Sequence, residues 1–333
     1  MGSVSLKKEN ILQKMLRQEQ SGLLIALIVL AVVFSIATPI FFTGLNLVNI
    51  LRQVSLNAIA AIGMTMIILT GEIDLSVGSI QALAGVTAVM VLNSTGSILI
   101  ALIVCLAIGV ATGLSTGLIV TKLGINSLIA TLGTMAIYRG IIMVATQAVS
   151  QPVLVEGFSD IGAGSVAGIP IPVIIAAGLI AVFIFILNNT VFGRYIYAVG
   201  GNKDSAKLAG LNVSNIKLKV YIIGNILFAL SAFILTSRLD SGQAIAGTGM
   251  EMNVIAACIL GGVSLNGGTG SLAGAIIGVV ILGVIQNGLV LLDVNTFYHD
   301  IVRGAVILIA VYLDVRRKKS SEARLLRESQ VAM

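Results

Sequence analysis

Few residues in this sequence could do chemistry, and the most conspicuous are two carboxylates between apolar runs. Glu72 and Asp74 lie in the stretch Gly71–Ser79, where two long apolar segments meet. An ionised group deep in a bilayer costs about 2.5–3.5 kcal/mol on insertion scales, so its position needs a physical reason. Asp74 could cap the helix that follows through the first-turn N–H groups. The stretch could equally be a broken helix whose backbone lines a polar path, and the two roles are compatible.

A second group of residues predicts a short, capped helix in a polar loop. Asn202 is suited to an N-cap, the next seven residues favour helix, and Gly210 is a natural stop. A helix of two turns is not stable alone, which favours docking into a groove of another surface. An ordinary positively charged loop would explain the lysines there, but not the capped, alanine-containing turn.

The remaining reactive residues predict neither an enzyme nor a metal protein. There is one histidine, His299, and the two cysteines, Cys105 and Cys258, lie inside apolar runs without metal-ligand spacing. The stretch Gly267–Gly270 lacks the lysine of a phosphate-binding loop. We therefore expect no cofactor bound by this chain. Arg139 lies in the middle of an apolar run, either as a functional residue or as a partner of a carboxylate or helix end.

The elements that position these residues follow from composition. The chain has 333 residues, of which 57% are hydrophobic and 10% charged, whereas soluble domains carry about 25% charged residues. This predicts an all-α, polytopic membrane protein, a single transmembrane domain over 1–333. Apolar runs long enough to cross a bilayer of about 30 Å, or nearly so, are Gly22–Phe41, Val54–Thr70, Val77–Leu92, Ser97–Val120, Ser127–Val149, Pro170–Leu187, Leu218–Thr236, Asn253–Leu265, Ser271–Leu292 and Ile301–Leu313.

The positive charges predict the orientation of these ten segments. An even number places both termini on one side, and sixteen of the twenty Lys and Arg residues then fall on that side. By the positive-inside rule this side is the cytoplasm. The prediction includes a cytoplasmic lead over 1–20, a cytoplasmic loop over 188–217 and a basic cytoplasmic tail over 314–333. The charge pattern belongs to membrane topology and predicts no nucleic-acid partner.

Glycines at four-residue spacing predict close helix packing. Gly109, Gly113 and Gly117 repeat in the fourth segment, and Gly270, Gly274 and Gly278 do so in the ninth. Small residues at this spacing let helix backbones approach each other in lipid.

Three blocks of sequence resemble one known family. The stretch Gly71–Ser79 is similar to the signature of the ribose-type sugar permeases of bacterial ABC importers. The loop from Gly201 to Val213 resembles that family's coupling loop, and Leu260 to Gly274 resembles its third block. The similarity runs from about Gly22 to Leu313. One departure is Glu72, where the family commonly has Gly.

The resemblance implies a transporter subunit with defined partners. It implies the ten-helix ABC importer permease fold in the bacterial inner membrane and a homodimer surrounded by lipid, with the sugar path at the dimer interface. An external, periplasmic binding protein would deliver the sugar, and ATP and Mg would bind to a cytoplasmic ATPase subunit. Residues matching the coupling pattern are Asn202, Ser205, Ala206, Ala209 and Gly210; residues matching the signature beside the path are Glu72, Asp74, Ser76 and Gly78.

Five amide side chains in or near the spans are candidates for sugar contact: Asn57, Asn126, Gln147, Asn225 and Asn287. Amides suit sugar hydroxyls, although a buried amide often joins helices instead. The leading cargo is ribose or a related pentose. The alternatives are a nucleoside, an autoinducer-like sugar derivative or an amino acid, or a proton- or cation-coupled secondary transporter that uses Asp74 and Glu72.

Overall fold

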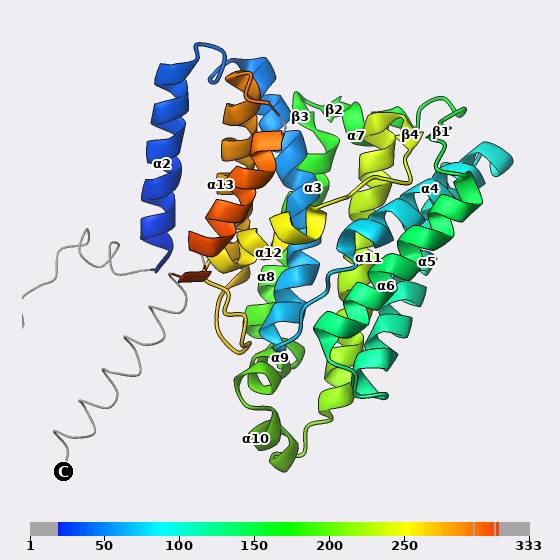
Figure 1. The fold of residues 1–333 in the computed structure, drawn as a ribbon, viewed down its shortest axis with the longest axis vertical. Coiled ribbons are helices and arrows are strands. Elements are labelled where there is room, and N and C mark those ends of the chain that lie inside the picture. The colour runs from blue at the N-terminus through cyan, green and yellow to red at the C-terminus, as the bar shows by residue number, and fades with distance from the viewer. Residues whose placement is uncertain (1–18, 296, 310, 313–333) are drawn as a thin grey trace, which may run out of the picture.

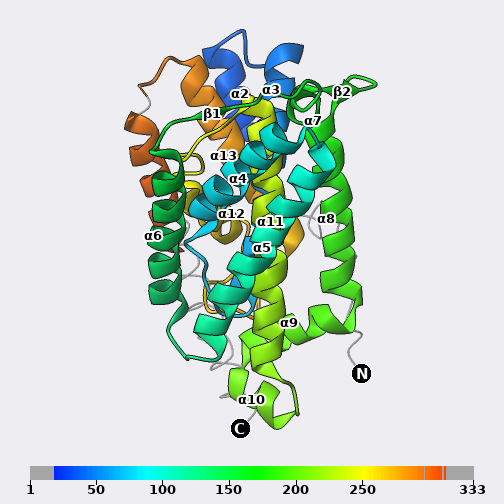
Figure 2. The ribbon, with the colours of Figure 1, turned by 90° about the vertical axis from the view of Figure 1, so that its right-hand side faces the viewer.

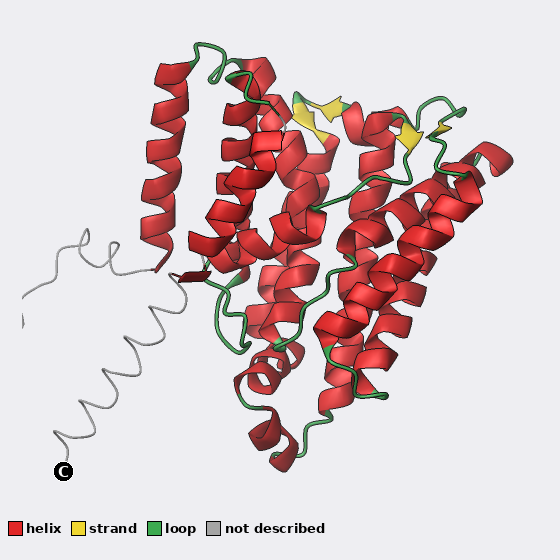
Figure 3. Cartoon of the chain, in the orientation of Figure 1, coloured by secondary structure: helices red, strands yellow, loops and turns green. Residues whose placement is uncertain are grey.

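The computed structural model describes residues 19–295, 297–309 and 311–312, and helices dominate it (Figure 3). The predicted basic tail lies outside these residues, as does the N-terminal lead except for its last two residues. The long helices are α2 (Glu19–Ala37), α3 (Gly44–Leu69), α4 (Val77–Thr95), α5 (Ile98–Thr121), α6 (Ser127–Thr146), α8 (Ile171–Asn189), α11 (Val213–Leu239) and α13 (Leu272–Leu291). Shorter helices are α7 (Ser159–Ala163), α9 (Val191–Gly201), α10 (Lys203–Leu208) and α12 (Met250–Leu260).

Seven helices in the described residues are long and apolar enough to cross a membrane: α3, α4, α5, α6, α8, α11 and α13. This confirms a polytopic, all-α membrane protein. Each of the ten predicted apolar runs contains a helix, because residues 297–309 are helical as well. The apolar part of α2 and the whole of α12 are shorter, so a count of ten crossings stays a prediction.

Two helix boundaries differ from the sequence-based ones in ways that affect the site. Helix α3 begins at Gly44, capped by the Thr43 side chain, ten residues before the apolar run in which we expected it. Helix α11 begins at Val213, inside the stretch expected to be loop. Polar residues near these helix starts have partners: Asn46 bonds Asn287 on α13, and Lys217 pairs with Glu72. The length of an apolar run does not reveal such pairs.

Helix α11 forms the centre of the bundle. It packs against α3, α4 and α5 (Figure 2), and its side chains Tyr221 and Phe228 are fully buried. The predicted glycine contacts are confirmed: a Cβ on Gly109 or Gly113 would lie within 3 Å of α11 backbone atoms. The glycines of α13 do the same for α12, since a Cβ on Gly278 would lie 2.1 Å from the oxygen of Ala257. The prediction is wrong for Gly270, which precedes α13 with a φ of +121° and packs against Val263 in the loop after α12.

Two non-helical stretches run through the bundle. Residues 72–76 leave the end of α3 and rise to the start of α4, and residues 243–249 descend to the start of α12 (Figures 1 and 3). Irregular backbone at membrane depth is tolerated only where protein or a water-filled cavity surrounds it. These are the discontinuities around which the candidate site is built.

The two ends of the bundle differ in character. At one end, here called the α7 end, lie α7 and two small antiparallel sheets (Figure 1). One pairs β1 (Gln151–Pro152) with β4 (Ser241–Gly242), and the other pairs β2 (Ser165–Val166) with β3 (Ile169–Pro170). At the opposite end, the α10 end, α9 and α10 project from the bundle. The expected sidedness places the α10 end in the cytoplasm.

Candidate functional site

Asp74 lies at the break between α3 and α4 and is completely buried. One carboxylate oxygen accepts hydrogen bonds from the Ser76 amide at 2.8 Å and the Ser76 hydroxyl at 2.5 Å. The other oxygen accepts from the Asn225 side-chain amide on α11 at 3.0 Å. Of the two roles considered for Asp74, capping through first-turn amides does not match these bonds, because the carboxylate accepts from the amide of Ser76, the N-cap residue of α4. Asp74 instead ties the broken segment to α11.

Glu72 forms an ion pair with Lys217 of α11. Lys217 is only 7% exposed, so it belongs to the interior and not to an exposed loop as its position in the sequence suggested. The pair supplies a partner for each charge, which a buried charge requires. It also explains how the chain accommodates the unusual carboxylate at position 72.

Neighbouring groups hold the same segment. The Ile73 amide donates to the Ser127 hydroxyl at 3.4 Å, and the Tyr221 hydroxyl donates to the Ile73 oxygen at 3.5 Å. The backbone between Glu72 and Asp74 is therefore attached to both α6 and α11. This satisfies polar backbone groups that no helix pairs internally.

The start of α4, directly after the first broken segment, meets the second broken segment at Gly78 and Gly247. A Cβ on Gly78 would lie 2.0 Å from the Gly247 oxygen, so only glycine allows this approach. Gln81, next to this contact, donates to Ser231 at 3.0 Å, and its buried side-chain oxygen has no hydrogen-bond partner in the described structure. Sequence reasoning missed Gln81 and Gly247; a glutamine inside an apolar run was the available signal for the former.

Arg139 on α6 supports the second broken segment. One of its terminal nitrogens donates to the carbonyl oxygens of Ala244 and Ala246, at 2.5 and 2.9 Å. A guanidinium can satisfy several backbone oxygens at once. Arg139 therefore stabilises irregular backbone, and these carbonyls take the place of the carboxylate or helix end that the sequence-based alternatives considered.

The five candidate sugar-contact amides do not come together in one place. Asn225 bonds Asp74, and Asn287 on α13 exchanges two hydrogen bonds with Asn46 on α3. Asn126 caps the start of α6, and Gln147 is the C-cap residue that follows the same helix in a left-handed conformation. Asn57 is half-buried on α3, with no hydrogen bond among the described residues. At least two of the five therefore join elements, while sugar contact by any of them stays a prediction.

The predicted short helix is present as α10. Asn202 is its N-cap, and its side-chain oxygen accepts from the Ser205 amide at 2.8 Å. The helix ends before Gly210, whose φ of +82° favours glycine. Ala206, one of the residues that match the coupling pattern, is buried against its own chain at 5% exposure. The other residues from Asn202 to Gly210 are exposed, among them Ser205, Ala209 and Leu208, which is 91% exposed.

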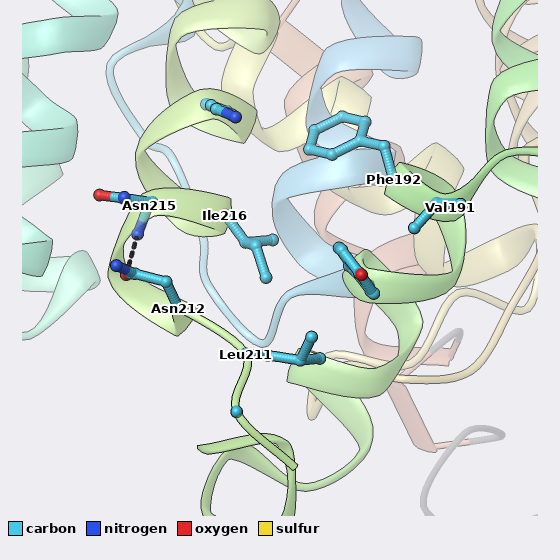
Figure 4. Close-up of a pocket in the computed structure, with 9 residues that line it drawn as sticks. Val191, Phe192, Leu211, Asn212, Asn215 and Ile216 are labelled. Atoms are coloured by element: carbon cyan, nitrogen blue, oxygen red, sulfur yellow. Dashed lines mark hydrogen bonds between the residues drawn. The ribbon is translucent and has the colours of Figure 1, made fainter.

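A hollow of about 480 Å³ lies beside α10, between α9 and the start of α11 (Figure 4). Phe192 and Val191 form one wall, and Leu211, Asn212 and Ile216 form the other. The Asn212 side chain caps α11 by accepting from the Asn215 amide at 3.0 Å. Apolar side chains at the surface of an otherwise polar loop are suited to contact another protein.

The three motif blocks meet at the α10 end of α3. The Gly268 amide donates to the Leu69 oxygen at 2.9 Å. A Cβ on Gly200 would lie 1.8 Å from that oxygen and 2.5 Å from the Gly268 nitrogen. Tyr197 donates to the Gly270 oxygen at 3.1 Å, and burial raises the pKa of this phenol. The end of α9 is therefore packed directly on the residues that precede the Glu72–Asp74 segment.

Helices interrupted around buried polar groups, with a docked loop at one end, are features of a multi-pass membrane transport protein. The chain belongs to the family described as branched-chain amino acid transport system / permease component, whose model matches residues 46–311. This makes it a permease of the bacterial cytoplasmic membrane and not an enzyme.

Individual relatives are similar over nearly the whole chain. The ribose import permease protein of Haemophilus influenzae is 45% identical, with 87% of this chain and 91% of the relative covered. The ribose import permease protein of Bacillus subtilis is 44% identical, covering 91% and 94%. The L-arabinose transport system permease protein of Escherichia coli is 37% identical, covering 91% and 92%. No solved structure matches the chain.

Proposed function

We propose that the chain is the membrane-spanning subunit of an ATP-driven importer for ribose or a closely related pentose. The identity of about 45% to ribose import permeases over nine-tenths of the chain supports this cargo. The lower identity to an L-arabinose permease supports the same class, a monosaccharide. The chain is expected to bind no ATP or Mg²⁺ itself; both belong to a partner ATPase.

The structure of α10 is the observation that favours an ATPase partner. The helix is capped and anchored by buried Ala206, yet it presents Leu208 almost entirely to the surroundings. An apolar side chain held out on a rigid helix gains free energy if a partner covers it, about 1.5–3 kcal/mol for full burial. Movement of α10 and α9 would be passed on to the end of α3 through Gly200 and Gly268.

Further partners follow from this proposal. A second copy of the chain would complete the sugar path, and an external binding protein would deliver the sugar at the α7 end. The buried signature residues Asp74, Ser76 and Gly78 would support the path by holding the broken segment in place. Asn57 is the best placed of the predicted sugar-contact amides, because its side chain is half-buried and unengaged within the described structure.

Leu208→Arg tests the ATPase contact. We expect the ATPase subunit recovered with the tagged chain in mild detergent to fall at least about tenfold, the equivalent of 1.4 kcal/mol. Ribose uptake into vesicles should fall with it, while the amount of inserted chain is unchanged because the side chain is outside the core. Leu123→Arg is the matched control, since Leu123 is 71% exposed in the neighbouring α5–α6 turn.

Equal recovery of ATPase with both variants would contradict the assignment of α10. Uptake of ribose by the purified chain alone, driven by an ion gradient, would overturn the ATP-driven mechanism and favour secondary transport. Uptake of an amino acid or nucleoside in place of ribose would support the ATP-driven importer and contradict ribose as its cargo.

A further inference from the structure

A polar cavity lies at the α10 end of the bundle, below the broken segment between α3 and α4. Its volume is about 420 Å³, within the range of about 300–1,000 Å³ usual for small-molecule sites. Its walls come from four parts of the chain, represented by Glu72 before α4, Thr121 at the end of α5, Asn126 before α6, and Ser214 and Lys217 on α11. It is a different hollow from the one in Figure 4.

The lining offers donors and acceptors suited to hydroxyl groups. Glu72 and Lys217 are paired at the wall, so a carboxylate acceptor and an ammonium donor stand side by side. Neighbouring hydroxyls of a sugar can bond such adjacent groups, because each hydroxyl both donates and accepts. Asn126, Ser214 and Thr121 add an amide and two hydroxyls. Glu72 and Lys217 neutralise each other, and Lys203 at the exposed edge adds a further ammonium donor, so the lining offers hydrogen-bonding groups for a polyol.

The position of the cavity connects the signature segment to the docked loop. Glu72 is two residues from Asp74, while Lys203, another lining residue, is the first residue of α10. A displacement of α10 would therefore move one wall of the cavity. Ser127 of α6, also in the lining, accepts from the Ile73 amide, so the α6 wall of the cavity is hydrogen-bonded to the broken segment.

We propose that this cavity is a release site, in which the monosaccharide is held by Glu72, Lys217, Asn126 and Ser214 before it enters the cytoplasm. The proposal rests on the proposed function, and it adds a sugar site within each single chain on the cytoplasmic side. Because α10 contributes a wall, the site would change its shape when the ATPase partner moves α10.

Protection of an introduced cysteine tests the site. Ser214→Cys is made in the full chain, where the native Cys105 and Cys258 are buried and give little background. The purified chain is treated with a maleimide reagent in the presence of ribose, of sucrose, or of neither. We expect ribose at twice its Kd to slow the labelling about threefold, because two-thirds of the sites are then occupied. Sucrose should have no effect.

Two further variants keep the test decisive. Leu123→Cys, exposed nearby and outside the cavity lining, should label at the same rate with either sugar. Thr121→Cys places the probe on α5 and replaces Ser214→Cys if that variant fails to fold. Labelling of both cavity variants that ribose does not slow, in a chain whose complete importer accumulates ribose, would overturn the release site and leave the proposed function standing. An importer that does not accumulate ribose would overturn both.

Discussion

At the scale of single residues, both carboxylates of the broken segment have hydrogen-bond donors as partners. The Asp74 carboxylate accepts three hydrogen bonds, two from Ser76 and one from Asn225, and Glu72 accepts one from Lys217. Asp74 and Asn225 are completely buried, so neither can exchange its partner for water. A buried polar group left without a partner costs about 1–3 kcal/mol. The identity of each donor and acceptor therefore matters more here than the charge or size of the side chain.

Asp74→Asn makes this testable. The new amide nitrogen would face a donor, either Asn225 or Ser76, and we expect a loss of about 1–3 kcal/mol in the free energy of unfolding. Ribose uptake per inserted chain should fall further than expression does. In the double variant Asp74→Asn with Asn225→Asp, the amide nitrogen at position 74 can donate to the carboxylate at position 225. The amide oxygen at position 74 still accepts from Ser76. The thermal midpoint in detergent and vesicle uptake are the measurements.

Recovery of the thermal midpoint in the exchanged pair would attribute the effect to the Asp74–Asn225 hydrogen bond. An exchanged pair no more stable than Asp74→Asn alone would show that Asn225 is not the partner that matters. An equal fall of uptake and expression in the single variant would leave Asp74 with a purely structural role.

At the scale of elements, the two breaks depend on each other. The start of α4 and the stretch before α12 touch through Gly78 and Gly247, and Arg139 binds the carbonyls of that stretch from α6. Gly247 has a φ of +71°, a conformation that also favours glycine. The contact therefore allows no side chain at either position, and each break positions the other.

Gly78→Ala should separate the two breaks. The added methyl would lie 2.0 Å from the Gly247 oxygen, and overpacking of this kind costs at least about 1–3 kcal/mol. We expect a lower thermal midpoint and loss of uptake. Gly133→Ala is the control, because a Cβ there meets no atom of the described structure within 4 Å, and alanine favours a helix interior by about 0.5–1 kcal/mol. Equal behaviour of the two variants would argue against the contact.

At the scale of the whole molecule, the bundle has two chemically distinct ends. The α10 end carries Lys203, Lys207 and Lys122, and the α7 end carries the small sheets and Glu156. Positive charges near the ends of spans face the cytoplasm. The structure places these three lysines at one end of the bundle, consistent with an orientation of the chain in which the α10 end faces the cytoplasm.

Single cysteines at the two ends test the orientation. Ser205→Cys lies on exposed α10, and Ala167→Cys lies in the exposed turn between β2 and β3. In cells whose cytoplasmic membrane is intact and accessible from outside, a membrane-impermeant maleimide should label Ala167→Cys and not Ser205→Cys. Inside-out vesicles should give the opposite result, and the buried native cysteines serve as the background. The reverse pattern would invert the orientation and move the proposed ATPase contact to the wrong side.

The sequence by itself determined the features that depend on local chemistry. Apolar runs predicted the membrane class, and Asn202 with Gly210 predicted the capped helix α10, because capping involves residues only a few positions apart. Glycine spacing predicted tight helix contacts, since spacing along a helix fixes one face. These features need no knowledge of what lies across the bundle.

Only the tertiary structure decided the partners. Asp74 binds Asn225 across 151 positions of sequence, and Glu72 binds Lys217 across 145. Ala206 turns inward while Leu208 turns outward, although both lie on the same two-turn helix. The physical reason is that a carboxylate, an amide or a small apolar residue has several acceptable environments of similar free energy. The choice among them depends on which helices pack against that position, and this is a property of the folded bundle.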